Sequence, residues 1–296
     1  MSLDRVIGSY IAGMALPVSA MSGSTLSSRQ MEDLSGLPRH ENIILGQLSS
    51  EHDKALSEVR AGAFDKALKW LGRAHHIMET GLETEESRRV GTSFHLAAVA
   101  YLDFHLARYQ EAEQGLHEAM VACKRLAEDH GHRHAAARRV HLARNLVRVS
   151  WMRGKHDDAV AMAYQLLTYL WADKTVWPFG AASDVRVERK PSEEEALWLS
   201  DELLSELPAM VDSARKMKRG FPPEPMGLAA ALGHCPVGER VRATHALCQS
   251  ATDRREHELE MALSTFFALG RGSFVLTWRK VEWLSRQCGV ALPLVE

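Results

Sequence analysis

One segment of this chain occurs three times, and it constrains the fold more than any other feature of the sequence. The first copy is RAGAFDKALKWLGRA at residues 60–74, and LARYQEAEQGLHEA (106–119) and MRGKHDDAVAMAYQLL (152–167) align with it without gaps. Corresponding positions lie 45 and then 47 residues apart. A segment that recurs at nearly constant spacing of this length favours repeated supersecondary units.

Each copy begins with a small residue and a ring, followed by apolar residues. A residue with little or no side chain permits a sharp turn between two helices, and a ring can pack under that turn. The apolar positions then follow at i, i+4 and i+7, which places them on one face of a helix. The aligned positions are Gly62, Ala107 and Gly154, then Phe64, Tyr109 and His156, then Ala67, Ala112 and Ala159, then Leu71, Leu116 and Ala163, then Ala74, Ala119 and Leu166. Each copy therefore predicts a helix hairpin, and hairpins with one uncovered apolar side must stack.

This order of residues resembles the second helix of the tetratricopeptide repeat family, over about residues 48–170. The resemblance implies an all-α fold in which three hairpins stack into a short right-handed superhelix. The chain departs from the family in its period, which exceeds the usual length of about 34 residues, and in His156, which stands where the family has an aromatic ring. An irregular helical bundle with chance similarity is the alternative.

The rest of the chain gives weaker signals. Pro178, Gly180 and Pro191 mark a connection, and the pair Ser192 and Glu195 predicts a capping box that opens a helix toward Lys218. Three more helices are expected near 239–250, 254–269 and 274–287, and no strand pattern is found. The predicted organisation is an N-terminal helical segment (1–47), TPR-like repeats (48–171), a linker (172–191) and a helical C-terminal region (192–296).

The composition limits the classes of function and location. With 46% hydrophobic residues and a formal net charge of -2, the chain is expected to be ordered and to have no global electrostatic attraction to nucleic acid or anionic membranes. Four scattered cysteines do not suggest a disulfide framework, which favours a cytoplasmic protein. The apolar start, ending in Val-Ser-Ala, resembles a cleaved signal, but an amphipathic helix is the preferred interpretation because the basic leading region is missing. No apolar run is long enough to predict a membrane span.

The distribution of charge along the chain says more about a partner than the net charge does. Between Gly131 and His156 there is no acidic residue but seven Lys or Arg residues. The family resemblance implies that the first helix of each hairpin lines a concave groove, and arginine forks beside an amide and aromatic rings suit a carboxylate-bearing peptide or helix. The expected partner-binding residues are Tyr101, His105, His141, Arg144, Asn145, Arg148 and Trp151.

A second charged segment has the opposite sign. Residues 191–214 carry seven acidic residues and no basic one. Three interpretations stay open: this acidic helix occupies the basic groove of its own chain, an external acidic partner does, or both charged surfaces are solvated. If the first two alternate, residues 192–214 act as an autoinhibitory plug.

Two further hypotheses concern nucleic acid and metal. TLSSRQMEDLSGLPRHENI (25–43) resembles a degenerate helix-turn-helix with Arg39, His40 and Asn42 on its second helix, although Glu32 and Asn42 fit that motif poorly. Such a segment before repeats would resemble a peptide-responsive transcription regulator. Four candidate zinc ligands also occur close together in sequence. They are His234, Cys235, His245 and Cys248.

No sequence signature of an enzyme was found. The chain lacks a phosphate-binding glycine loop, a nucleophile elbow and a helical His-Glu-x-x-His. HGHRH (130–134) could bind a metal but is more simply a loop. The preferred prediction is therefore a non-catalytic protein-interaction module, an adaptor, chaperone or regulatory scaffold, that binds an acidic peptide or helix without a cofactor. The partner's identity and the oligomeric state stay open.

Overall fold

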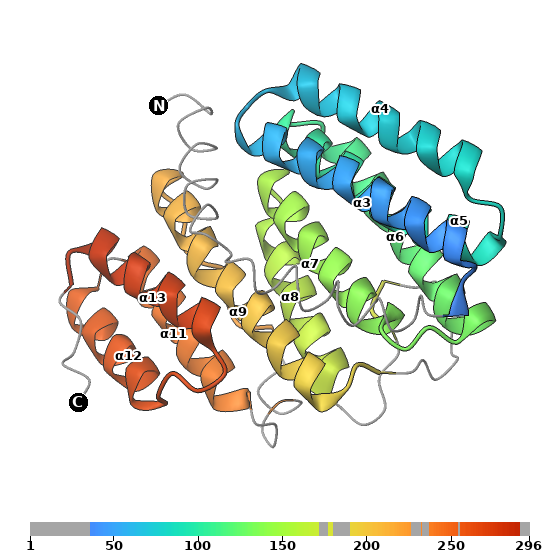
Figure 1. The fold of residues 1–296 in the computed structure, drawn as a ribbon. Coiled ribbons are helices and arrows are strands. Elements are labelled where there is room, and N and C mark those ends of the chain that lie inside the picture. Colours follow the sequence, from blue (N-terminus) through green and yellow to red (C-terminus); the bar gives the residue numbers. More distant parts are fainter. Residues whose placement is uncertain are drawn as a thin grey trace. The chain divides into compact units, whose positions relative to one another are not determined.

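The structure is a computed structural model that describes residues 36–171, 177–179, 190–225, 232, 237–253 and 255–290. Within these residues the chain forms ten α-helices and no strand (Figure 1). The prediction of an all-α fold is therefore confirmed. None of these helices has the length and apolar character needed to cross a lipid bilayer. The chain divides into two compact units, one ending at residue 153 and one containing the helices that follow.

Five helices form the first unit. They are α3 (Arg39–Arg60), α4 (Phe64–Gly81), α5 (Glu85–His105), α6 (Tyr109–His130) and α7 (Ala135–Met152). Within this unit α3 packs on both α4 and α5, α5 packs on α6, and α6 packs on α7. Consecutive helices thus form packed pairs, as the repeated segment predicts.

The three aligned small residues all adopt the left-handed backbone conformation. The backbone angle φ is +74° at Gly62, +58° at Ala107 and +82° at Gly154. Positive φ is the conformation that a Cβ atom disfavours, which explains why small residues stand at these positions. After each turn the next helix begins at the aligned ring position. These first residues are Phe64 of α4, Tyr109 of α6 and His156 of α8 (His156–Trp171).

The aligned apolar positions form the buried face of each second helix. Ala67, Ala112 and Ala159 are all 0% exposed. The positions that follow are also buried. They are Leu71, Leu116 and Ala163, then Ala74, Ala119 and Leu166. An alanine at the closest approach lets two helix backbones come near each other, so the sequence pattern and the packing agree.

Two apolar clusters hold the first unit together. One joins α3, α4 and α5 near their turns. Its buried members are Ala55, Val59, Ala67, Leu71, Ala98 and Leu102. The other lies toward the opposite ends of these helices and also takes in Leu126 of α6 and Ala135 of α7. The first unit therefore has a core that continues from one hairpin to the next, the arrangement expected of stacked repeats.

The second unit contains α8 and four later helices. These are α9 (Glu193–Lys216), α11 (Gly238–Asp253), α12 (Glu256–Ala268) and α13 (Val275–Cys288). The capping box at Ser192 and Glu195 is present, with the Ser192 backbone N–H donating to the Glu195 carboxylate at 2.8 Å. All four helices lie within a few residues of their predicted ranges.

The central helix of the second unit is α9. It packs on α8, α11 and α13, and every residue from Asp201 to Val211 is buried. A helix buried on all sides is a core helix. Trp171 Nε1 of α8 donates a hydrogen bond to Ser200 Oγ of α9 at 2.9 Å.

The helix and unit boundaries differ from the expected organisation in two places. The expected boundary between residues 47 and 48 lies inside α3, which begins directly after Pro38. The third hairpin is divided between the units, because α7 packs on α6 whereas α8 packs on α9.

Candidate protein-binding face

The first helices of the hairpins, α3, α5 and α7, bring basic and histidine side chains together in two rows. In each row, one residue comes from each helix. The histidine row consists of His52, His95 and Arg138, and the turn row, closer to the hairpin turns, consists of Arg60, His105 and Arg148. Residues of one row lie 43 to 45 positions apart in sequence, so each row follows the period of the repeat.

The histidine row is built around two buried imidazoles. His52 Nε2 and His95 Nδ1 are 3.1 Å apart and share a hydrogen bond, and the two side chains are 5% and 8% exposed. The guanidinium of Arg138 stacks over the Phe94 ring, with its carbon 4.3 Å from the ring centre. Exposed His75 of α4 extends the row, with its ring centroid 5.4 Å from that of His95.

Burial keeps both imidazoles neutral. It lowers the pKa of His52 to about 3, and the nearby His95 and Arg138 lower it further in the same direction. The pKa of His95 is lowered to about 4 by burial and then by His75. Burial also lowers the pKa of Arg138. The row therefore holds a cation beside two uncharged rings at neutral pH.

The turn row places His105 near two arginines, Arg60 and Arg148. Burial lowers the pKa of His105 to about 4, and Arg60 and Arg148 add to this effect by repulsion. Its Nε2 atom is buried and has no hydrogen-bond partner among the described residues. Arg60 is exposed, and Arg148 donates to Asn145 Oδ1 at 3.4 Å. Three first helices thus contribute to one positively charged row.

Aromatic rings line the turn row. The Tyr101 and His105 ring centroids are 4.5 Å apart, and Phe104 lies 5.6 Å from His105 in an edge-on arrangement. Phe104 in turn contacts Tyr109, the first residue of α6. Rings beside guanidinium groups suit a partner that carries both apolar and acidic side chains.

The seven sequence-predicted residues differ in accessibility. Five of them are half-buried, so part of each side chain reaches the surface. They are Tyr101, His105, His141, Asn145 and Arg148. By contrast, Arg144 is 7% exposed and Trp151 only 1% exposed. The structure places His105 and Arg148 in one row and pairs Asn145 with Arg148.

Sequence reasoning missed four members of these rows. The predicted partner-binding residues did not include His52, Arg60, His95 or Arg138. The signal was the spacing: Arg60 precedes His105 by 45 residues and His52 precedes His95 by 43. Extending the alignment of the repeat backward into the first helices would have found these residues.

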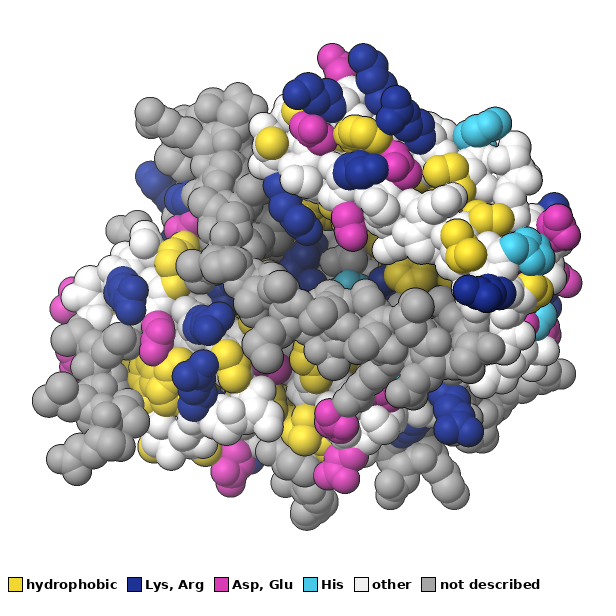
Figure 2. All heavy atoms as spheres, viewed as in Figure 1, with side chains coloured by type: hydrophobic (Ala, Val, Ile, Leu, Met, Phe, Trp, Pro, Cys, Tyr) yellow, Lys and Arg dark blue, Asp and Glu magenta, His cyan; other side chains and the backbone are white. Residues whose placement is uncertain are grey.

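The outer surface of the same unit has a different character. Along α4 the exposed side chains include Asp65, Lys66, Leu68 and Lys69, and Figure 2 shows acidic, basic and apolar groups interspersed there. Mixed charges of this kind are typical of a solvated surface. The exposed side chains of α4 therefore do not share the predominantly basic and histidine character of the two rows.

Most acidic side chains of residues 192–214 are buried. The interpretation that this charged segment is solvated is therefore wrong for most of its charges. Glu202 is 0% and Glu206 2% exposed, and Asp201 and Glu195 are also buried. The reason is that α9 forms the core of the second unit. Only Glu193 and Glu194 at its start are exposed.

The helix-turn-helix hypothesis meets a structural obstacle. Its first helix, in residues 25–35, lies outside the described residues. The proposed recognition helix is the start of α3, where Arg39 and His40 are exposed but Glu41 is fully buried. Asn42 Nδ2 donates to the Leu37 carbonyl oxygen at 3.3 Å. This helix turn is thus part of the first hairpin.

Half of the candidate zinc set lies outside the described residues, namely His234 and Cys235. His245 Nδ1 contacts the Tyr164 hydroxyl, and both His245 and Cys248 are buried. Burial raises the pKa of Cys248, which disfavours the thiolate that a metal requires. The residues that the structure describes include no group of three ligating side chains able to hold a metal ion.

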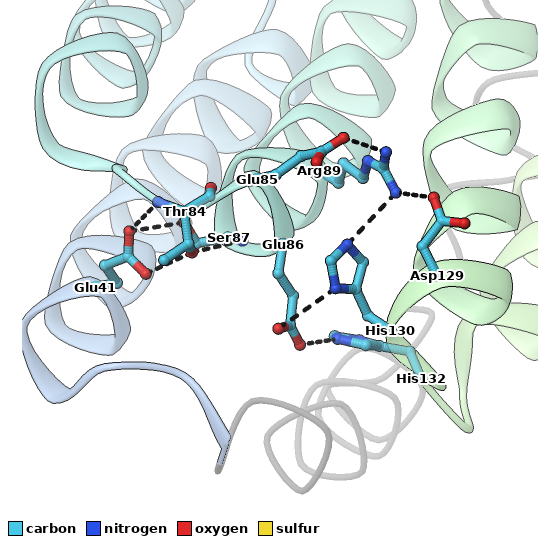
Figure 3. A network of polar contacts seen from close by, with 9 residues as sticks. All are labelled: Glu41, Thr84, Glu85, Glu86, Ser87, Arg89, Asp129, His130 and His132. Carbon is cyan, nitrogen blue, oxygen red and sulfur yellow. Dashed lines mark hydrogen bonds and ion pairs between the residues drawn. The ribbon is translucent and has the colours of Figure 1, made fainter.

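The HGHRH loop binds the start of α5 (Figure 3). His132 Nε2 lies 2.6 Å and His130 Nδ1 3.6 Å from the two carboxylate oxygens of Glu86. Beside them, Arg89 forms ion pairs with Asp129 and Glu85. The contacts of this loop with Glu86 anchor the α6–α7 connection to the second hairpin.

No protein-family model matches the chain, and neither a curated protein nor a solved structure matches it. The resemblance to tetratricopeptide repeats therefore stays a prediction that rests on the aligned residues.

Proposed function

We propose that the chain is a non-catalytic interaction module that binds an acidic peptide or helix on the face formed by α3, α5 and α7. In this proposal α3 to α8 are three TPR-like hairpins in a right-handed superhelix, and the protein acts in the cytoplasm as an adaptor, chaperone or regulatory scaffold. The single observation that carries it is the turn row, where the His105 ring packs against the Tyr101 and Phe104 rings and lies near Arg60 and Arg148.

The chemistry of the turn row favours an acidic partner. Two arginines near one neutral ring favour a negatively charged partner, because carboxylates are attracted to their positive potential. The adjacent Tyr101 and Phe104 rings offer apolar contact beside the charges. Together these groups suit a segment with alternating acidic and apolar side chains.

The role of residues 192–214 as an autoinhibitory plug is not part of this proposal. Because α9 is the core of its own unit, its release would expose Leu203, Leu204 and Leu207, which are 0 to 1% exposed. The proposed partner is therefore an external acidic peptide or helix.

Selection from a random peptide library tests this function. Wild type is expected to enrich peptides rich in Asp and Glu, whereas Arg60→Glu should lose this preference. Arg60 is a suitable position because it is exposed. A charge reversal at Arg144, which is 7% exposed, would bury a carboxylate and confound binding with folding.

Arg125→Glu is the matched control, because Arg125 is also exposed but lies on α6, which is not one of the three first helices. This variant should enrich the same acidic peptides as wild type. Selection of the same peptides by all three proteins, or no acidic preference in wild type, would contradict the proposed function.

A further inference from the structure

The histidine row contains a cation, Arg138, for which the described residues provide no carboxylate partner. Its Nε atom is buried and has no hydrogen-bond partner among them. The guanidinium instead stacks on Phe94. A half-buried guanidinium with unused donors is costly unless an anion completes its environment.

The two imidazoles supply a hydrogen-bond donor whichever tautomers they adopt. A neutral imidazole has one N–H and one bare nitrogen. If His52 Nε2 donates to His95 Nδ1, the proton of His95 lies on Nε2; if His95 Nδ1 donates, the proton of His52 lies on Nδ1. In both cases one ring N–H remains outside the shared hydrogen bond. The row therefore combines a cation with at least one further donor.

We propose that Arg138 and the His52–His95 pair form an oxyanion subsite. This inference rests on the proposed function, under which the oxyanion is a side-chain carboxylate of the acidic partner. It goes beyond that function because it assigns a second point of recognition to residues separate from the turn row.

The two rows define a spacing for the partner's acidic groups. Along α5 the rows are ten residues apart, from His95 to His105, and along α7 the interval from Arg138 to Arg148 is the same. At a rise of about 1.5 Å per residue this separation is about 15 Å. A helical partner would span it with acidic residues about ten positions apart, and an extended partner with residues about four to five positions apart.

NMR of the full chain with histidine labelled at Cε1 tests the subsite with two probes, inorganic sulfate and a capped hexaglutamate peptide. Both probes are expected to shift the resonances of His52 and His95, assigned by substituting each to Gln. The exposed His257 of α12 serves as an internal reference that should not shift.

Arg138→Gln should weaken the dissociation constants for both probes by at least about tenfold, the loss expected for a charge-assisted hydrogen bond. Arg138→Lys keeps the charge and should retain part of the affinity, which separates loss of the site from loss of folding. Arg125→Gln removes a charge from the outer helix and should bind as wild type does. Thermal unfolding by circular dichroism checks that each variant is folded.

Unshifted His52 and His95 resonances, or equal responses in wild type and folded Arg138→Gln, would overturn the inference. A response to sulfate but not to hexaglutamate would overturn the carboxylate assignment and leave a free inorganic anion as the occupant. If His105 responds while the histidine row does not, the proposed function stands and this inference fails. If the histidine row responds but no acidic peptide is selected, the reverse holds.

Discussion

The carboxylate of Glu41 in α3 accepts two hydrogen bonds from Thr84, the N-cap residue of α5. Thr84 donates to it with both its backbone N–H and its hydroxyl, each at 2.7 Å (Figure 3). The backbone N–H of Glu83 and the Ser87 hydroxyl donate as well, at 2.6 and 3.0 Å. Four donors on one fully buried carboxylate make Glu41 a polar link between α3 and the start of α5.

Replacing Glu41 with Gln should destabilise the first unit. The substitution removes the charge and sets an amide NH₂ group against donors, so several of the four bonds are lost. We expect the free energy of unfolding to fall by about 2–4 kcal/mol, measured by urea denaturation. Glu79→Gln on the exposed surface of α4 should change it by no more than about 0.5 kcal/mol. Equal effects of the two substitutions would contradict this role of Glu41.

Glu41 also makes stability depend on acidic pH. Burial would raise its pKa, but the hydrogen bonds from Thr84, Glu83 and Ser87 outweigh this and lower the pKa from its usual 4.5 to about 2. Because the folded-state pKa is the lower one, the stabilisation is complete above pH 4.5 and is lost as the pH falls toward 2. Glu41→Gln should flatten the decline in stability across this window, and an unchanged slope would refute the assignment.

As the pH falls, proton uptake by His52 in the unfolded chain should destabilise the fold at a higher pH than protonation of Glu41 does. The pKa of His52 is about 3 in the folded chain and 6.5 when unperturbed, so below pH 6.5 the unfolded chain takes up a proton that the folded chain does not. The free energy of unfolding should therefore fall between pH 6.5 and 3 by about 1.4 kcal/mol per pH unit for such a group. His52→Gln should make this decline shallower in urea denaturation, whereas exposed His76→Gln should not.

In the second unit, Asp201 of α9 performs a similar task for α13. It is 3% exposed and accepts hydrogen bonds from the backbone N–H groups of Leu276 and Thr277, both at 2.8 Å. No side chain of α13's own N-cap residue, Phe274, makes a capping bond. Asp201→Ala should therefore loosen the first turn of α13.

Hydrogen exchange measures this effect directly. In Asp201→Ala the amides of Leu276 and Thr277 should exchange at least about tenfold faster, as expected when about 1.4 kcal/mol of protection is lost. Asp212→Asn is the control, because Asp212 lies on the same helix but pairs with Lys216. Unchanged exchange in Asp201→Ala would show that packing alone fixes the start of α13.

Local patterns predicted much of this fold. The turns at Gly62, Ala107 and Gly154, the buried alanines that follow them, and the capping box at Ser192 depend on neighbouring residues, so a sequence pattern is enough to find them. The all-α class and the ranges of the C-terminal helices follow for the same reason.

Contacts between distant residues account for what the sequence did not predict. Glu41 and Asp201 look like surface carboxylates, and their burial depends on backbone donors 43 and 75 positions away. The histidine row likewise joins residues of three helices. The acidic residues of 192–214 suggest a charged surface helix. Its Leu and Met residues instead decide its position in the core of the second unit.

Replacing Ala107 with glycine should stabilise the chain, whereas a glycine substitution within a helix usually destabilises a protein. Ala107 has a φ of +58°, which costs an L-residue about 1–2 kcal/mol. Glycine avoids this cost but loses more entropy on folding, about 0.5–1 kcal/mol. Ala107→Gly should therefore stabilise the chain by up to about 1 kcal/mol in urea denaturation.

The reverse substitution at Gly62 should destabilise by a similar amount. A Cβ built there meets no atom within 4 Å and φ is +74°, so the cost arises from the backbone alone. Gly46→Ala is the matched control, because Gly46 lies within helix α3, has equally open space and has no positive φ. There the same chemical change should stabilise by about 0.5–1 kcal/mol. If Gly62→Ala and Gly46→Ala shift the free energy of unfolding in the same direction, the left-handed turn is not what selects the small residue of the repeat.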